Sequence, residues 1–242
     1  MLALTSSALR YLWAMAPIKE RARSAEDKEL RIRNLLAAAR ALGLESGVRE
    51  VTLTAVTARV GLHPSALRRY FESREELLLE LAEQGWGEWR ETLLPMLSER
   101  HDLAPEELAE LLSESLERQP LFCDLLTHVV LSLEGSVRLE RARRYKLAAT
   151  EAYDAMAAAL AGAAADLDRD RAGLVLTAAM SCAAYLYQLS RPTATLRELY
   201  AEEPRWAHDA LSFRQQLTEL LTAVALGSGA VQRRPAPGSS SL

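Results

Sequence analysis

The strongest constraint on the fold is that strand-forming patterns are missing from a chain rich in helix formers. Ala, Leu, Glu and Arg dominate the 242 residues, and no run of β-branched residues alternates with polar ones. These four residue types favour helices, whereas alternation marks a half-buried strand. The sequence therefore predicts an all-α protein of about nine helices. Breaks are expected at Gly43 to Gly47, Gly61, Pro95, Pro120, Gly135, Gly162 to Asp168, and Arg191 to Pro204.

Charge and composition divide the chain into segments. Residues 18–74 hold 12 Lys and Arg against 7 Asp and Glu, whereas residues 75–242 hold 16 against 26. A basic front on an acidic body is expected if only the front meets a polyanion. We predict a disordered or basic arm at 1–23, a basic domain at 24–74, a larger helical domain at 75–226 and a disordered tail at 227–242.

The chain is expected to be soluble and cytoplasmic. No uninterrupted apolar run approaches the ~20 residues that span a bilayer. The first residues lack a basic start and Arg10 interrupts their apolar run, which disfavours secretion; Met15 is an alternative first residue. Cys123 and Cys182 lie in apolar helical runs, where small buried thiols are expected, and this fits a reducing compartment.

Residues 52–71, TLTAVTARVGLHPSALRRYF, predict two short helices joined by a tight turn. Thr52 can cap the first helix, and Gly61 supplies a sharp exit that a residue with a Cβ would resist. His63 and Pro64 restart the chain, since proline at a first helical position loses nothing by lacking an N–H. The second helix is expected to run to about Tyr70.

This second helix has two unlike faces. Its apolar face, spaced i, i+3, i+4, carries Leu67, Tyr70 and Phe71. Its opposite face carries Ser65, Arg68 and Arg69. Two short helices joined by a glycine turn, with arginine and serine presented outward, are typical of a helix-turn-helix that places a recognition helix in the major groove of DNA.

The stretch TLTAVTARVGLHPSALRRYFESREELL, residues 52–78, resembles the signature of the tetracycline-repressor (TetR) family of bacterial regulators. The positions that match are Thr52, Val56, Gly61, Leu62, Leu67, Tyr70, Phe71, Ser73, Glu75 and Leu77. The positions that depart from the family pattern are Thr57, Val60, His63, Arg68 and Arg74. The resemblance implies a helix-turn-helix DNA-binding domain at 24–74 and an effector-binding and dimerisation domain at 75–226.

We predict a DNA-binding surface made of Thr52, His63, Pro64, Ser65, Arg68, Arg69, Tyr70 and Arg74. Arg69 is expected to contact a base, and Arg68 and Arg74 phosphates. A solvated helix face is the alternative for Arg68 and Arg69. His63 is either a cap or a DNA contact, and Thr52 is a cap that in resembling proteins also meets a phosphate. The arm residues Lys19, Arg21 and Arg23 either follow the DNA or form a solvated tail.

Large apolar and amphipathic side chains are frequent in the body, where resembling regulators keep an inducer cavity. They are Trp86, Trp89, Met96, Phe122, His128, Tyr145, Tyr153, Met180 and Tyr185. For any one of them alone, a place in the core is the better explanation. As a set they predict a site for an apolar or aromatic effector, with His128, Tyr153 and Tyr185 as polar contacts.

The segment 172–189 is apolar on all sides, which the surface helix of a monomer cannot be. It is either fully interior or paired with a second subunit. By resemblance we predict a four-helix homodimer interface, built by this segment and the last helix through Ala179, Ala183, Phe213, Leu217, Leu220 and Val224.

No metal, cofactor or catalytic centre is predicted. The remaining histidines are far apart in sequence, and neither H-x-x-x-H nor C-x-x-C spacing occurs. No G-x-S-x-G elbow supports a nucleophilic triad. The sequence therefore predicts a homodimeric transcriptional regulator, most simply a repressor, that binds a pseudo-palindromic operator and a small effector. The alternative is a helical ligand-binding or protein-interaction module without DNA binding.

Overall fold

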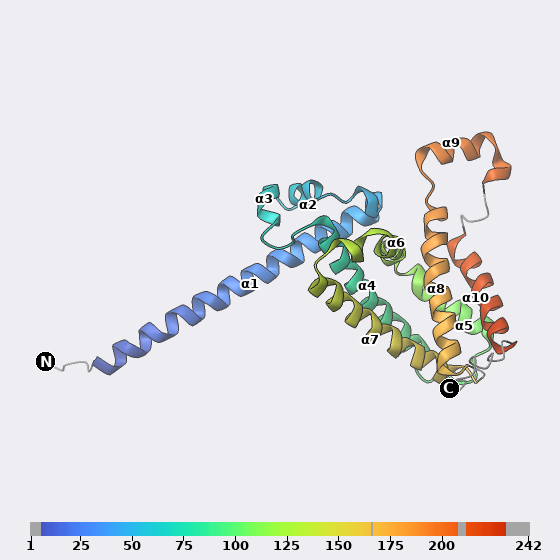
Figure 1. Ribbon diagram of the computed structural model, residues 1–242, viewed down its shortest axis with the longest axis horizontal. Helices are drawn as coiled ribbons and strands as arrows, with labels where there is room; N and C mark the ends of the chain where they lie inside the picture. The colour runs from blue at the N-terminus through green and yellow to red at the C-terminus, as the bar shows by residue number, and fades with distance from the viewer. Residues whose placement is uncertain (1–5, 166, 208–211, 231–242) are drawn as a thin grey trace, which may run out of the picture.

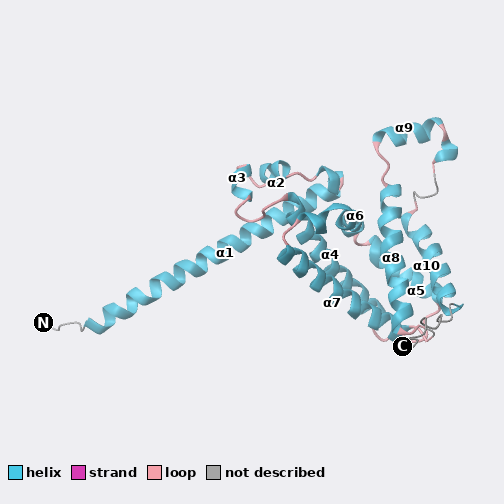
Figure 2. Cartoon of the chain, in the orientation of Figure 1, coloured by secondary structure: helices cyan, strands magenta, loops and turns pink. Residues whose placement is uncertain are grey.

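The structure is a computed structural model that describes residues 6–165, 167–207 and 212–230. Every regular element among these residues is helical, as predicted (Figure 2). The α-helices are α1 (Ser6–Ser46), α2 (Leu53–Arg59), α3 (Pro64–Leu67), α4 (Arg74–Leu97), α5 (Pro105–Glu117), α6 (Pro120–His128), α7 (Leu139–Ala163), α8 (Arg169–Ser190), α9 (Ala194–Glu202) and α10 (Phe213–Ala230). Four shorter 3₁₀ or π segments join them: η1 (Val48–Glu50), η2 (Val129–Leu133), η3 (Glu134–Ser136) and η4 (Pro204–Trp206).

Helix α1 begins at Ser6, within the segment 1–23 that the sequence predicts as a disordered or basic arm. Residues 6–23 include four Ala, three Arg and two Leu, which favour a helix despite Pro17. Figure 1 shows this first half of α1 projecting away from the rest of the chain. Residues 1–5 of the predicted arm and 231–242 of the predicted tail lie outside the described residues.

The second half of α1 packs with α2 and α3 into a small N-terminal unit. Leu35, Val56 and Leu67 are fully buried at its centre. Local caps set the helix boundaries, because the side chain of Thr52 accepts a hydrogen bond from Ala55 N (3.1 Å). Gly61 has φ +66°, a left-handed conformation that glycine adopts readily, and so ends α2 as predicted.

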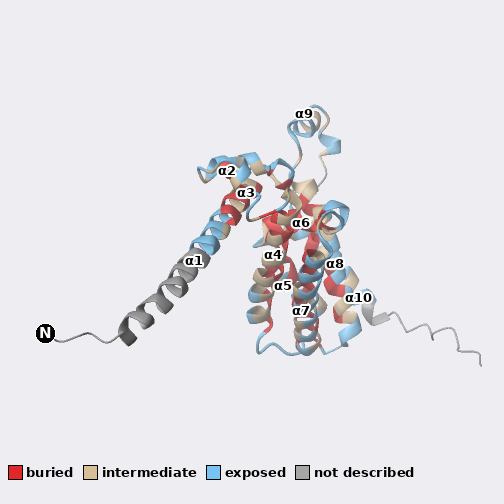
Figure 3. Ribbon diagram, turned by 60° about the vertical axis from the view of Figure 1, so that its left-hand side comes forward, coloured by how far each residue is buried: buried red, intermediate tan, exposed pale blue. Residues whose placement is uncertain are grey.

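Helix α4 leaves this unit and becomes the central helix of the body. Ser73 caps it by accepting a hydrogen bond from Glu76 N (3.1 Å). The helix continues past Pro95 to Leu97. In the body, α4 packs against α7, α7 against α8, and α10 against both α8 and α5. Figure 3 shows the buried residues gathered along the inner sides of these helices.

Helix α8 alone among the described helices is long and apolar enough to cross a membrane by length and composition. It packs against α6, α7 and α10, however, and 39% of its most apolar window is buried. These contacts are those of a core helix in a helical bundle.

Helix α9 is the element that the sequence does not predict, and it raises the α-helix count among the described residues to ten. It lies in the stretch 191–204, where two prolines predict a break. Thr193 nevertheless caps it through Leu196 N (3.4 Å), and none of its residues is buried. Figure 1 shows α9 standing clear of the body at the end of the molecule that also carries α2 and α3.

Candidate functional site

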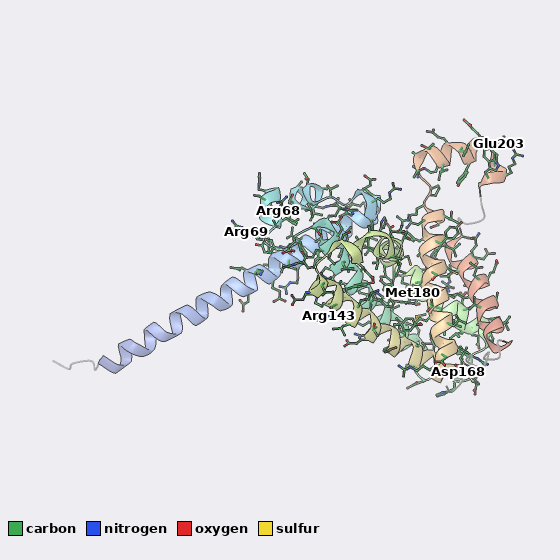
Figure 4. All side chains as sticks on the ribbon, viewed as in Figure 1. Arg68, Arg69, Arg143, Asp168, Met180 and Glu203 are labelled. Atoms are coloured by element: carbon green, nitrogen blue, oxygen red, sulfur yellow. The ribbon has the colours of Figure 1, made fainter. Side chains whose placement is uncertain are left out.

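Residues 64–71, which comprise helix α3 and the turns after it, have a polar outer face and a packed inner face. Leu67 is fully buried and Phe71 is 5% exposed, whereas Ser65, Arg68 and Arg69 are exposed. The predicted division of faces is therefore confirmed. The regular helix ends at Leu67 rather than at Tyr70, and hydrogen-bonded turns continue the chain to Phe71. Figure 4 shows Arg68 and Arg69 at the outer edge of the N-terminal unit.

The start of α3 is built by His63. Its Nδ1 accepts a hydrogen bond from Ser65 N (3.3 Å) and lies 2.9 Å from Ser65 Oγ. This geometry supports the cap interpretation of His63, and the ring stays exposed. Contact of His63 or of the Thr52 hydroxyl with DNA stays a prediction.

Arg74, the first residue of α4, binds the turn that precedes α2. Its Nε donates to Val51 O (2.5 Å), and one terminal nitrogen donates to Val48 O (2.7 Å). The side chain is 27% exposed and also lies 3.6 Å from the Glu75 carboxylate. The guanidinium therefore has an internal role that the sequence does not reveal, because its partners are backbone carbonyls more than twenty residues earlier. The predicted contact with a phosphate stays a prediction.

The same turn is held from the body side by Asp124 of α6. Its Oδ2 accepts the Val48 N–H (2.8 Å), and its Oδ1 accepts the Gln188 side-chain amide of α8 (2.9 Å). The Asp124 residue is 5% exposed, and His128 Nε2 lies 3.5 Å from Oδ1. Burial pushes the pKa of Asp124 upward, but His128 and the Val48 and Gln188 donors outweigh it and hold the pKa below its usual value.

Sequence reasoning missed Asp124, although a signal was present. An aspartate inside the apolar run LFCDLL cannot be buried without partners, and His128 follows it by four residues on the same helix face. Its main partner, Val48, lies 76 residues earlier and is not evident from the sequence.

Ion pairs also connect the N-terminal unit to the body. Arg40 of α1 reaches Glu88 of α4 (2.5 Å), and Arg138, just before α7, reaches Glu72 (2.7 Å). Within the body, the 6% exposed Arg141 side chain of α7 contacts Glu83 of α4 (2.8 Å). The N-terminal unit is thus tied to α4, α6 and α7 by charged or buried polar contacts.

Four of the predicted effector residues form a packed aromatic cluster. The rings of Trp86, Trp89 and Phe122 lie with centroids 5.4–5.9 Å apart. Trp86 Nε1 donates to the Tyr145 hydroxyl and Trp89 Nε1 to Ser115 Oγ, each at 2.9 Å. Burial raises the pKa of Tyr145 to about 12. Their polar atoms are thus satisfied within the chain.

The other predicted effector residues are spread over the body. Tyr153 donates to Gly173 O (2.6 Å), which fixes α7 against α8. Met96, His128 and Met180, the last labelled in Figure 4, are half-buried, and Tyr185 is 64% exposed. None of the nine predicted residues lines any of the four hollows described for this part of the chain. A role in effector binding stays a prediction for each of them.

The largest of these hollows lies where the N-terminal unit meets α8 and α9. This junction groove has a volume of about 1020 Å³ and is lined by residues 45–50, 187–188, 190–194, 197, 200–201 and 207 together with Asp124. Three smaller hollows lie between α1 and α4, between α5 and α10, and between α4 and α7. Only the junction groove is lined by Val48 and Asp124, which join the two parts of the chain.

The predicted dimer residues occupy two different environments. Ala179, Ala183 and Leu217 are fully buried within the chain, so they have no surface to offer a second subunit. Phe213 and Val224 are half-buried. Leu220 is 45% exposed, and Leu226 of α10 and Leu174 and Tyr185 of α8 are exposed as well. Because α8 is apolar on all sides, its sequence pattern alone could not show which side packs in the core of its own chain.

Neither cysteine forms a disulfide. Cys123 is buried, and burial raises the pKa of its thiol to about 12, so it is protonated at neutral pH. Cys182 is half-buried, and burial raises its pKa as well. Across the described residues, no group of three or more His, Cys, Asp or Glu side chains is placed to hold a metal ion.

A capped helix-turn-helix with exposed arginines, mounted on a larger helical body, is the architecture of a DNA-binding regulator. The family model described as bacterial regulatory proteins, tetR family, matches residues 35–81. The model described as tetracyclin repressor-like, C-terminal domain, matches residues 83–232, which is more than half of the chain. The chain belongs to the TetR family, whose members are DNA-binding transcription factors and generally not enzymes.

Solved structures that match the chain include three regulators or binding proteins. A TetR/AcrR-family transcriptional regulator from Thermobifida fusca is 21% identical, with a TM-score of 0.47 over 79% of this chain and 96% of that chain. The multidrug binding protein EbrR, complexed with imidazole, is 19% identical (TM-score 0.48; 78% and 94% covered). The fatty acid degradation regulator FadR from Bacillus halodurans is 13% identical (TM-score 0.48; 78% and 97% covered). Among curated proteins, none matches the chain.

Proposed function

We propose that this protein is a homodimeric repressor that binds a pseudo-palindromic operator through α3 and is released from it by a small effector. The observation that carries the DNA-binding part is the outer face of residues 64–71, where Arg68 and Arg69 stay exposed in the turns that directly follow α3 and the inner side is anchored by Leu67 and Phe71. Arg69 reads a base and Arg68 meets a phosphate in this proposal, with Ser65 beside them.

Dimerisation is supported by exposed apolar side chains on α8 and α10. Four large apolar side chains there are 45–64% exposed: Leu174, Tyr185, Leu220 and Leu226. A second copy that covers these residues would build a four-helix interface and hold two α3 helices at a fixed spacing, as two half-sites ~34–36 Å apart require.

Release follows from linkage. An effector that binds more tightly to the conformation with misplaced α3 helices lowers DNA affinity, and DNA lowers effector affinity by the same factor. The body can transmit such a change because Asp124 and Arg74 both hold the turn before α2. This mechanism places the protein in the cytoplasm, where its operator lies.

The alternative, a helical ligand-binding module without DNA binding, is tested by the salt dependence of retention on duplex DNA. The proposal predicts that affinity for nonspecific duplex falls steeply as salt rises, because phosphate contacts release counterions. Substitution of Arg68 and Arg69 together by glutamine should flatten that dependence. Retention that does not change with salt, or that the double substitution leaves unaltered, would favour the alternative.

A further inference from the structure

The junction groove carries an excess of unpaired positive charge. Three arginines line it, Arg49, Arg191 and Arg197, and none of them forms an ion pair with a carboxylate among the described residues. Arg197 donates only to a backbone carbonyl, that of Pro192 (2.7 Å). Arg191 lies 3.5 Å from Leu44 O.

The carboxylates of the groove do not balance these arginines. Glu45 is engaged by Arg59 through two hydrogen bonds (2.7 and 2.8 Å), which lower the pKa of Glu45. Asp124 is engaged by the Val48 and Gln188 donors. Glu50 is then the one lining carboxylate without a recorded partner in the described part of the chain. An anion entering the groove would therefore meet more available cations than carboxylates.

One of these cations is held in place against an aromatic ring. The Arg191 guanidinium carbon lies 5.1 Å from the centroid of the Tyr187 ring. Tyr187 is 7% exposed and is itself packed edge-on against Phe213 (6.4 Å). A planar guanidinium fixed in this way is suited to bidentate contact with a carboxylate and to stacking on a flat ring. Tyr200, half-buried on α9, adds a second aromatic side chain to the wall.

We propose that the junction groove binds a small aromatic carboxylate, with Arg191 and Arg197 as its anion contacts. The volume of about 1020 Å³ is ample for such a molecule. The inference rests on the proposed function for its regulatory meaning, since the groove wall includes the turn at 47–50 that positions α2 and α3. A ligand that shifts this turn would change the Asp124–Val48 and Arg74–Val48 contacts, and through them the position of α2 and α3.

The test is calorimetric titration of the full-length protein with 1-naphthoate and with its neutral analogue 1-naphthamide. Saturable binding is expected for the carboxylate, with at least about tenfold weaker binding for the amide, since the amide cannot engage guanidinium as an anion. Replacing Arg191 and Arg197 together by glutamine should weaken naphthoate binding at least about tenfold. Arg100→Gln with Arg118→Gln is the matched control, because both are exposed arginines outside the groove.

Three results would overturn the inference. The first is absence of saturable naphthoate binding, and the second is equal binding of carboxylate and amide. The third is a double variant that binds naphthoate normally but, without naphthoate, binds DNA more weakly and with an affinity that depends less on salt. That result would make these arginines phosphate contacts instead. Naphthoate binding to a protein that retains no duplex DNA would leave the groove assignment standing and remove the proposed repressor function.

Discussion

At the scale of single residues, the turn at 47–51 is held from two sides by side chains of opposite charge. Asp124 accepts a hydrogen bond from the Val48 N–H, and Arg74 donates hydrogen bonds to the carbonyls of Val48 and Val51. Thr52, the cap of α2, follows directly. Any change in these two contacts therefore moves the start of the helix-turn-helix.

Asp124→Asn should lower the free energy of unfolding by about 1–3 kcal/mol, because an amide cannot accept both the Val48 and Gln188 donors without turning its own NH₂ toward one of them. Chemical denaturation at pH 7 measures this. Asp154→Asn is the control, since Asp154 is exposed and its ion pair with Arg169 is long, at 3.9 Å. A loss no greater than that of the control would show that the network adds nothing to stability.

The effect of Asp124 should also depend on pH. Because its folded-state pKa is lowered, its contribution is fully present above the unfolded value near 4 and is lost as pH falls through the lower folded value. The difference in unfolding free energy between wild type and Asp124→Asn is therefore expected to shrink as pH falls below 4. A difference that grew below pH 4 would contradict the assigned ionised state.

Arg74→Ala distinguishes an internal clamp from a phosphate contact. We expect a loss of about 1–2 kcal/mol in stability, because the carbonyls of Val48 and Val51 lose their charged donor. DNA affinity should fall for all sequences while its salt dependence stays unchanged. A salt slope reduced by about 0.9 with unchanged stability would instead make Arg74 a phosphate contact.

At the scale of elements, two glycines of α4 have different surroundings. A Cβ on Gly85 would lie 2.4 Å from a ring carbon of Phe122, whereas one on Gly87 would meet nothing within 4 Å. Gly85→Ala should therefore cost about 1–3 kcal/mol through overpacking. Gly87→Ala should stabilise α4 by up to about 1 kcal/mol through helix propensity. Thermal unfolding of the pair checks both, and equal midpoints would refute the packing seen between α4 and α6.

The dimer prediction also belongs to this scale. Leu174→Arg with Leu220→Arg should yield a folded monomer that no longer binds the operator, because both side chains are exposed in the single chain. Leu131→Arg, at a 76% exposed position of η2, is the control that should stay dimeric. Ala179→Arg would instead unfold the body, since Ala179 is fully buried. Light scattering that shows a wild-type monomer at micromolar concentration would exclude the interface.

How far the sequence predicts these elements depends on whether their signals are local. Capping residues and apolar spacing are local, so the boundaries at Thr52, Gly61 and Ser73 and the two faces of α3 could be predicted. The short α9 between two prolines was missed because it has no buried stripe. The junction groove was missed for another reason, since its walls come from segments more than 130 residues apart.

At the scale of the whole molecule, charged and buried polar contacts join the N-terminal unit to the body in addition to the apolar core that the two parts share. Arg40 with Glu88, Arg138 with Glu72, and Asp124 with Val48 span this boundary. Because such contacts have defined geometry, a small displacement of the body would also displace α2 and α3. In this arrangement Trp86, Trp89 and Phe122 form a packed aromatic cluster that holds α4 against α6.

The measurement that tests the central claim most directly is operator binding by Arg69→Ala. An operator is first selected from a random duplex library with the wild-type protein, and affinities are then measured by fluorescence anisotropy at fixed salt. The account predicts that Arg69→Ala loses about 1–3 kcal/mol on the selected operator and much less on unrelated duplex, because a base contact carries specificity. The control Arg100→Ala should bind as wild type does. Equal affinity of wild type and Arg69→Ala for the selected operator would contradict the assignment of α3 as the DNA-reading helix.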